Sequence, residues 1–560
     1  MIKYRFLVLA IILFIADAAF AQVVKTIDST MIAGHKAIYD SKGKIQSWFD
    51  PGVPGAGYSH VMKTASRFIQ SETPVDPGTG KKLYYISCCF QGPHMVSEQD
   101  FLDGKSWEHW PHNPACVFAG LTKSLVIDYR VYSGDEQYTD VVKEMLDYQL
   151  RNGTTPAGWG WSRVPFASST PGDTIYRGAT GWEEDGLRGD GINGIEPDKV
   201  GELGVSYLLF FEVTGDKKYL SAARDCANAL ASHVRDVNPE DKQFVSSNTS
   251  RSPWPFRVNA KDGTVISEYC SNVIEPIHLF DELIRLGKAV ALTEQELEAY
   301  KKARKIAWRW LFSINGPMKT YIWNAYFEDV PNDPDHSNRL QITPMETARY
   351  LLEHPGMDPD LDTDIPALLN WVESVFGTKG MDAIKEQTWC FEPMGSHTAR
   401  FASVCALWYR HSRDERFKEK AYRYFNLATY MCDDNGVVRV GPNWPETWFS
   451  DGYGDYIRHF YEGLVAVPEW SPAGEDHLLH STSVVQTIMY NARSVSYRTF
   501  DNVSTETLSL KALPVSITVG DRSLKKGEEG TDYWSTVKLP NGNYKVSIHH
   551  TKGNKVEVKF

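Results

Sequence analysis

A short turn sequence occurs three times in this chain, each time between an apolar segment rich in small residues and an amphipathic segment. The copies begin at Ser133, Thr214 and Ser412 and read SGDEQY, TGDKKY and SRDERF. A glycine suits a helix C-terminus that requires positive φ, and the third copy has Arg413 at that position. The aspartate suits the N-cap of the next helix, and the aromatic residue three positions later would anchor that helix. Repeated junctions of this kind predict a stacked or ring-closed array of helical hairpins.

Helical periodicity places pairs of such segments along most of the chain. The five predicted pairs are 114–132 with 137–150, 197–213 with 219–234, 268–286 with 294–312, 343–352 with 364–376, and 397–409 with 415–431. A sixth segment of the first kind, 453–465, has no partner after it, because Pro468 and Pro472 interrupt the pattern. The amphipathic segment 58–68 would close the ring. The predicted fold class is therefore mainly α, an (α/α)6 toroid, and an open solenoid is the alternative.

The character of the sequence changes after about residue 475. Short segments that alternate or are rich in β-branched residues follow one another, with turns such as Pro540-Asn541-Gly542-Asn543 between them. This pattern is typical of antiparallel strands. We therefore expect a toroid domain over 22–475 and a small C-terminal antiparallel β domain over 476–560.

The first 21 residues read as a cleaved export signal. Lys3 and Arg5 precede an apolar run over 6–15, and Ala19-Phe20-Ala21 is a small-x-small cleavage site. The alternative is an uncleaved membrane anchor, but the run is short and Asp17 interrupts it. We therefore expect a periplasmic or secreted protein.

Charge and cysteine content exclude several classes of partner. The net charge of −12 argues against nucleic acid and against anionic membrane surfaces as partners. Eight cysteines are few for 560 residues, so no disulfide scaffold is implied. Because no Cys/His spacing resembles a zinc site, we expect no metal and no cofactor. A homo-oligomer is left open.

The loops that enter the inner helices of a toroid form one rim of its central cavity, and these loops are long here. Loops carry function while a scaffold positions them, and aromatic faces bind the apolar faces of sugar rings. The rim loops hold eight tryptophans: Trp159, Trp161, Trp182, Trp254, Trp323, Trp389, Trp444 and Trp448. Although any one of them could be a core residue, the set predicts a sugar-binding rim.

Hydrolysis of a glycosidic bond requires one protonated carboxyl group and a second carboxylate. Glu196 and Asp198 flank Pro197 at one predicted helix start, and Glu268 occupies the next. We predict Glu268 with Asp198 or Glu196 as the catalytic pair; the alternative is that such acids only complement helix dipoles. The predicted substrate-binding residues are Trp161, Asp190, Tyr269, Asn272, Arg339, His397, Arg400 and Tyr453. Arginine suits this role because it binds a carboxylate bidentately, so an acidic sugar is the expected substrate.

The export signal, the repeated hairpin turn, the aromatic rim and the β tail together resemble the secreted six-hairpin glycosidases. The chain is most similar in these features to glycoside hydrolase family 154, whose activity is β-glucuronidase. The unsaturated glucuronyl hydrolases of families 88 and 105 share the toroid and use two aspartates from neighbouring rim loops. By counting hairpins, Asp198 and Glu268 occupy comparable adjacent positions. The resemblance implies release of glucuronic acid from glycans.

Two other functions fit the same features. A polysaccharide lyase would cleave a uronate polymer by β-elimination, with a tyrosine or histidine base and an asparagine or arginine that neutralises the uronate. Tyr269, Asn272, His397 and Arg400 could take those roles. A non-catalytic glycan-binding protein is the third interpretation.

Overall fold

The computed structural model describes ten parts of the chain, and everything below refers to them. They are residues 31–73, 82, 114–167, 193–237, 252–270, 272–324, 338–388, 392–447, 450–527 and 530–560. The predicted export signal, Asp190 and the tryptophans Trp182, Trp389 and Trp448 lie outside them. Among the helices in these parts, none combines the length and the apolar character that a membrane crossing requires.

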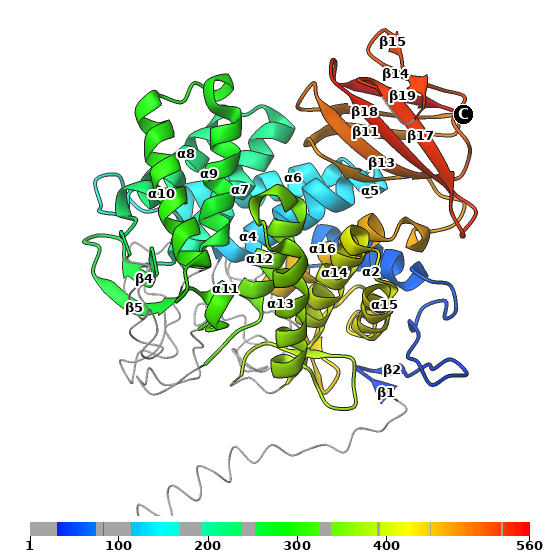
Figure 1. The fold of residues 1–560 in the computed structure, drawn as a ribbon, viewed down its shortest axis with the longest axis horizontal. Helices are drawn as coiled ribbons and strands as arrows, with labels where there is room; N and C mark the ends of the chain where they lie inside the picture. The colour runs from blue at the N-terminus through cyan, green and yellow to red at the C-terminus, as the bar shows by residue number, and fades with distance from the viewer. Residues whose placement is uncertain are drawn as a thin grey trace, which may run out of the picture.

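Within the described residues, six helical segments form a closed inner ring (Figure 1). They are α4 (Pro114–Leu121), which continues through η3 (Thr122–Tyr129) and α5 (Arg130–Ser133), then α7 (Pro197–Thr214), α9 (Ile274–Leu286), α12 (Ile342–Glu353), α14 (Gly395–Ser412) and α16 (Ser450–Ala466). Each helix packs against the next, and α16 packs against α4. The ring is therefore closed, and the open solenoid is excluded.

A second layer of helices surrounds this ring. Its members are α2 (Ala56–Arg67), α6 (Gln137–Asn152), α8 (Lys217–His233), α10 (Glu294–Phe312), α13 (Leu361–Phe376) and α15 (Glu415–Thr429). Helix α2 packs against both α15 and α16, so the prediction that segment 58–68 completes the outer layer is confirmed. The fold is mainly α, an (α/α)6 toroid.

The repeated turn has the predicted left-handed residue at all three junctions, and the aspartate is the N-cap at the second and third, whereas Glu136 is the N-cap at the first. Gly134 (φ 77°), Gly215 (φ 74°) and Arg413 (φ 62°) are left-handed residues that end their helices. At the second junction the Asp216 side chain accepts a hydrogen bond from the Lys218 backbone N–H at 3.1 Å. Arg413 is a non-glycine residue in this region, where a Cβ atom costs about 1–2 kcal/mol.

One predicted boundary is wrong. The segment 268–286 was expected to be helical throughout, but α9 begins only at Ile274. Pro276 lacks the N–H that a helix interior needs, so it is tolerated only in the first turn and fixes the start. The Asn272 side chain accepts a hydrogen bond from the Ile274 backbone N–H at 3.2 Å. The residues before it belong to a rim sheet of order β3-β4-β5, formed by β3 (Gly194–Ile195), β4 (Pro255–Asn259) and β5 (Val265–Cys270).

The C-terminal strands form two five-stranded sheets. One has the order β10-β13-β18-β17-β16 and the other β11-β12-β19-β14-β15. All pairings are antiparallel except that of β16 with β17. The strands are β10 (His477–Ser481), β11 (Val485–Asn491), β12 (Ser494–Thr499), β13 (Ser504–Leu510), β14 (Ser516–Val519), β15 (Arg522–Ser523), β16 (Lys525–Lys526), β17 (Tyr533–Lys538), β18 (Tyr544–His550) and β19 (Lys555–Lys559). Their inner faces share one apolar core.

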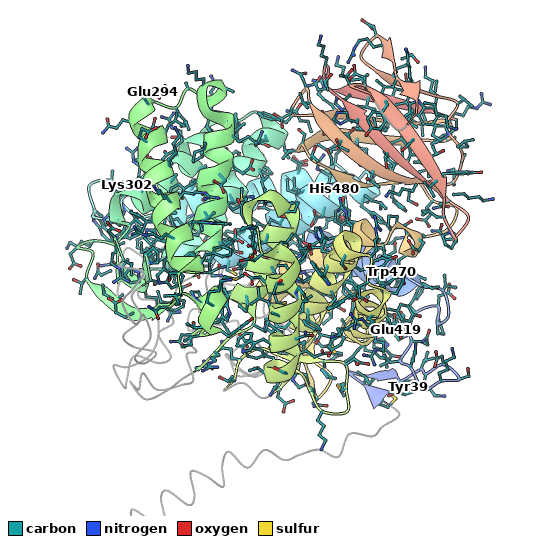
Figure 2. The ribbon with its side chains drawn as sticks, viewed as in Figure 1. Tyr39, Glu294, Lys302, Glu419, Trp470 and His480 are labelled. Carbon is teal, nitrogen blue, oxygen red and sulfur yellow. The ribbon has the colours of Figure 1, made fainter. Side chains whose placement is uncertain are left out.

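Buried polar contacts join these sheets to the toroid. The Arg130 guanidinium is fully buried on α5 and donates to the backbone carbonyls of Val485 and Gln486 on β11. His480 on β10 lies where the two parts meet (Figure 2). Burial lowers the pKa of His480 to about 4, so this imidazole is neutral at physiological pH.

Short elements complete the described structure. They are η1 (Phe68–Glu72), η6 (Gly287–Val290), α11 (Pro317–Thr320), η7 (Pro355–Met357), η8 (Pro468–Trp470), β1 (Met31–Ile32), β2 (His35–Lys36), β6 (Ile384–Lys385), β7 (Pro393–Met394), β8 (Arg439–Gly441) and β9 (Trp444–Thr447).

Candidate active site

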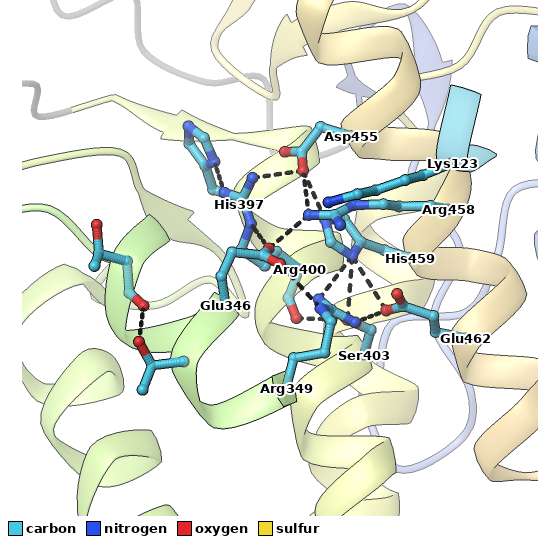
Figure 3. Close-up of polar contacts among 12 residues, drawn as sticks. Lys123, Glu346, Arg349, His397, Arg400, Ser403, Asp455, Arg458, His459 and Glu462 are labelled. Carbon is cyan, nitrogen blue, oxygen red and sulfur yellow. Dashed lines mark hydrogen bonds and ion pairs between the residues drawn. The ribbon is translucent and has the colours of Figure 1, made fainter. Parts of the chain in front are cut away.

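Charged side chains project from the inner helices toward the axis of the ring. They repeat at spacings of three and four residues on helices that are otherwise small and apolar: His397 and Arg400 on α14, Glu346 and Arg349 on α12, and Asp455, Arg458, His459 and Glu462 on α16. Residues at these spacings share one helix face. Figure 3 shows these side chains converging from the three helices.

Two arginines bridge two carboxylates at the centre of this cluster. Arg400 Nε lies 2.9 Å from Glu346 Oε1, and its Nη2 lies 2.5 Å from Asp455 Oδ1. Arg458 Nη2 contacts the same two carboxylates, at 2.6 Å and 3.2 Å. Glu346, Arg400 and Asp455 are the fifth or sixth residues of their helices, so α12, α14 and α16 run parallel with their N-termini at one rim.

The arginines determine the charge of these carboxyl groups. Burial alone would raise the pKa of Glu346, but the surrounding arginines outweigh it and hold that pKa well below its usual value. The same balance, with Arg400 as the main countercharge, holds the pKa of Asp455 well below its usual value. Both groups are therefore carboxylates at any physiological pH.

His459 is the neutral member of the cluster. Its ring is fully buried, and burial lowers its pKa well below the usual value. Glu346, Asp455 and His459 bring ligand atoms within 4.8 Å of one another, a spacing that a metal ion could use. Both carboxylates already bind arginine, however, and a cation there would face two guanidinium groups. The donor set therefore does not fit a metal.

A pocket of about 130 Å³ lies beside this cluster on the ring axis. Its lining includes Lys123 and Asp128 from η3, Glu275 and His278 from α9, and Arg458 from α16. Burial raises the pKa of Asp128 to about 8, so that group is protonated at neutral pH. The pocket is thus polar and lined by acids and bases from several inner helices.

Glu275 lines this pocket and is ionised. Lys123 Nζ lies 3.4 Å from Glu275 Oε1 and 3.3 Å from Oε2. Burial alone would raise the pKa of Glu275, but Lys123 and His278 outweigh it and keep that pKa below its usual value. Glu275 is therefore a carboxylate.

Asp198 is a second acid at the same rim, with the opposite shift. Burial raises the pKa of Asp198, although the neighbouring Lys199 opposes that effect. Its Oδ1 accepts a hydrogen bond from the Lys199 backbone N–H at 2.9 Å. One turn further on, Gly201 lies against α9, because a Cβ at this glycine would come within 2.9 Å of the Glu275 carbonyl carbon. Asp198 and Glu275 therefore lie on neighbouring turns of two touching helices.

The structure holds the other predicted catalytic acids in separate ion pairs. Glu196 is the N-cap of α7 and is buried, with its Oε1 2.6 Å from Arg257 Nε. Glu268 lies on β5 rather than at a helix start, and its carboxylate contacts Arg235 Nη1 at 2.9 Å and 3.0 Å. About a third of the Glu268 side chain is exposed, so it remains accessible at the rim.

Two of the predicted aromatic contacts are packing residues in this structure. Trp161 is buried and stacks on His233 with 4.2 Å between ring centroids. Tyr453 is buried, and its hydroxyl accepts a hydrogen bond from the Val438 backbone N–H. Trp254 and Trp323 are buried as well, so the expectation of an open aromatic rim is wrong for these three tryptophans.

The remaining predicted residues have mixed placements. His397 joins the axial cluster, because Arg400 Nη1 donates to His397 Nδ1 at 2.7 Å. Arg339 lies at the rim, where its backbone N–H donates to Thr388 Oγ1. Asn272 contacts the start of α9, as described above, and the side chain of Tyr269 lies outside the described residues.

Several members of the axial site were missed from the sequence. They are Lys123, Glu275, His278, Glu346 and Arg349. A signal was present, since each is a charged or ionisable residue within an otherwise small and apolar inner segment.

No protein-family model and no curated protein sequence matches this chain. Among solved structures, a D-mannose isomerase superposes with a TM-score of 0.46 and 13% identity, covering 73% of this chain and 97% of its own. A family 76 glycoside hydrolase from a bovine Bacteroides thetaiotaomicron strain gives 0.44 and 11%, with 74% and 78% covered. A family 88 glycosyl hydrolase from Bacteroides vulgatus gives 0.41 and 10%, with 74% and 100% covered. Likeness at this level assigns no activity to this chain.

Proposed function

We propose that this chain is a glycoside hydrolase that releases glucuronic acid from a glycan at the axial site. The observation that supports this most directly is the pair formed by Asp198 and Glu275. They lie on touching helices at one rim, and their environments move their pKa values in opposite directions. Two carboxyl groups with separated pKa values are what acid-assisted glycoside cleavage requires.

The proposed roles follow from those charges. Asp198, whose pKa burial raises, takes the role of the acid and donates its proton to the oxygen of the departing group. Glu275, held ionised by Lys123, activates a water molecule or attacks the anomeric carbon. Once Asp198 has lost its proton, the adjacent Lys199 ammonium stabilises the carboxylate.

Glu268 remains the alternative ionised partner. It was the choice from sequence, and its carboxylate is a third exposed at the same rim. Glu196 is a weaker candidate, because its carboxylate is buried against Arg257. The three acids can be separated by amide variants, which keep the shape and remove proton transfer.

Recognition of an acidic sugar would use Arg458, which lines the pocket and keeps 11% of its side chain exposed. An arginine fork can bind a carboxylate in two places. This residue supports glucuronate over a neutral sugar as the bound residue.

The test compares Asp198→Asn, Glu275→Gln and Glu268→Gln on an aryl β-glucuronide and on a glucuronate-capped oligosaccharide. We expect the first two variants to lose about 10²–10⁴-fold in kcat with the fold intact, since general acid–base catalysis contributes that much. The aryl β-glucoside of the same aglycone should react far more slowly than the glucuronide. Near-normal activity of Asp198→Asn on both substrates refutes the assignment, and equal rates on glucoside and glucuronide refute uronate recognition.

The same experiment tests the lyase alternative through the ultraviolet absorbance of the product. A β-elimination product contains a conjugated double bond and absorbs ultraviolet light, whereas a hydrolysis product does not. His397 and Arg400, which a lyase would recruit, are buried, and Arg400 donates hydrogen bonds to both His397 and Glu346. Ultraviolet absorbance on a uronate polymer would nevertheless replace the hydrolase by the lyase.

Export is proposed on the sequence alone. We expect the mature protein to begin near Gln22 after removal of residues 1–21 and to be periplasmic or secreted. N-terminal sequencing of protein from the periplasmic fraction checks this, and an intact N-terminus in the membrane fraction contradicts it.

A further inference from the structure

Lys123 is an unusual residue for its place in the fold. It lies on η3, a π-helical stretch of the first inner segment, among buried neighbours such as Thr122 and Ser124. π-Helical turns occur frequently at functional sites. A buried ammonium is costly unless it is paired, and the Lys123 Nζ contacts both oxygens of Glu275. The pair joins the first inner segment to α9 across the pocket.

We infer that Lys123 is a positioning residue for the proposed reaction: it orients the Glu275 carboxylate toward the pocket and supplies its countercharge. The inference rests on the proposed function, since it assigns the ionised role to Glu275. It goes further by naming the group, from a different helix, on which that role depends.

The other charged groups around Glu275 do not replace Lys123. His278 is on the same helix, one turn away, and Glu346 on α12 opposes ionisation. Arg458 on α16 faces Glu275 but already contacts Glu346 and Asp455. On α7, Glu202 contacts the Lys199 ammonium at 3.0 Å and adds a further negative charge near Arg458. Of the cations named here, the Lys123 ammonium is the one that forms an ion pair with Glu275.

The sign of the effect follows from this arrangement. Without the Lys123 charge, burial and Glu346 both favour the protonated form of Glu275, so its pKa rises. A protonated Glu275 can neither activate water nor attack carbon. The acid limb of the kcat profile should therefore move to higher pH, while KM changes less than kcat. Lys123→Arg keeps the charge and should restore the original limb.

The experiment uses the full chain as Lys123→Met, Lys123→Arg and a matched control, Lys420→Met. Lys420 forms a comparable ion pair with Glu373 at 2.6 Å, but it lies on the outer helix α15. Carboxyl-stretch infrared spectra are recorded against pH for each background with and without Glu275→Gln, so that the difference isolates the titration of Glu275. The pH profile of kcat is measured on the aryl β-glucuronide.

We expect the Glu275 titration and the acid limb to move together to higher pH in Lys123→Met, and neither to move in Lys420→Met. If circular dichroism shows that Lys123→Met does not fold, Lys123→Gln takes its place, because glutamine removes the charge but keeps a hydrogen-bond donor. The same titration and the same kcat profile are then measured on Lys123→Gln. The inference is overturned if the Glu275 titration in Lys123→Met stays at the wild-type pH. It is also overturned if that titration moves while the acid limb of kcat does not, provided that Glu275→Gln inactivates the enzyme. Failure of the proposed function gives a different result. In that case Glu275→Gln retains activity, or the wild type has none, while the infrared titration of Glu275 still depends on Lys123.

Discussion

Two glycines at one helix crossing should respond oppositely to the same substitution. Gly454 on α16 and Gly120 on α4 face each other where the ring closes. A Cβ at Gly454 would lie 2.4 Å from the Gly120 carbonyl carbon and 2.7 Å from the Leu121 nitrogen. A Cβ at Gly120 would lie 3.7 Å from its nearest atoms, which is ordinary van der Waals contact. Alanine therefore fits at one glycine and not at the other.

The magnitudes follow from two competing effects. Alanine is favoured over glycine in a helix interior by about 1 kcal/mol, and Gly120→Ala should gain up to that amount. Gly454→Ala has the same gain, but overpacking a dense core costs about 1–3 kcal/mol, and the obstructing atoms are backbone that cannot rotate away. We expect the upper end of that range and a net loss of about 2 kcal/mol.

Thermal denaturation of the two variants and the wild type, at one pH and scan rate, measures the difference. A change of 1 kcal/mol moves the Tm of a domain of this size by a few degrees. Gly120→Ala should melt at or above the wild-type Tm and Gly454→Ala clearly below it. Because Asp455 follows Gly454 directly, the second variant should also lose activity. Equal shifts of the same sign would refute the packing argument.

Three further changes test other parts of the structure. Glu346→Gln removes one of the two carboxylates that Arg400 and Arg458 contact, so chemical denaturation should show a loss of about 3–5 kcal/mol, and an unchanged midpoint would contradict the buried network. The pKa of Asp128 in the folded state lies near 8, above its value in the unfolded state, so the free energy of unfolding falls as pH rises from about 4 to 8. Asp128→Asn should therefore show a smaller fall in Tm between pH 5.5 and 8 than the wild type. Arg413→Gly relieves the left-handed strain at φ 62° and should raise the Tm slightly, by up to about 1 kcal/mol in stability.

The fold could be predicted because its signals are local. At the three repeated junctions, a left-handed residue is followed by an aspartate that accepts a hydrogen bond from the backbone N–H two residues further on, and these few residues specify the junction. The missed boundary before Ile274 has a different cause. Residues 265–270 form a strand because they pair with β4, which is separated from them by only five residues, so the helical interpretation overlooked a local hairpin.

The site could be predicted only in part, for a physical reason. Spacing along a helix shows that Glu346 and Arg349 share a face, but not that Arg400 and Arg458 come to meet Glu346 from two other helices. Burial decides the pKa shifts, and it depends on the whole ring. Asp198 was found because an acid beside a proline marks a helix start. Glu275 was not predicted as a site residue because the sequence pattern places the start of its helix six residues earlier, at Glu268.

Asp198 and Glu275 show how much of the site depends on neighbours rather than on helix position. Each is the second residue of its helix, α7 and α9, and each residue is 7% exposed. The helix dipole favours a negative charge equally at both positions, so it cannot separate them. The difference lies in the countercharges: Lys123 contacts both oxygens of Glu275, whereas the cation nearest Asp198, Lys199, is paired with Glu202 at 3.0 Å, and the Glu202 carboxylate opposes ionisation of Asp198. A lysine from a third inner segment that contacts both oxygens of one acid can therefore separate the pKa values of two acids at one rim.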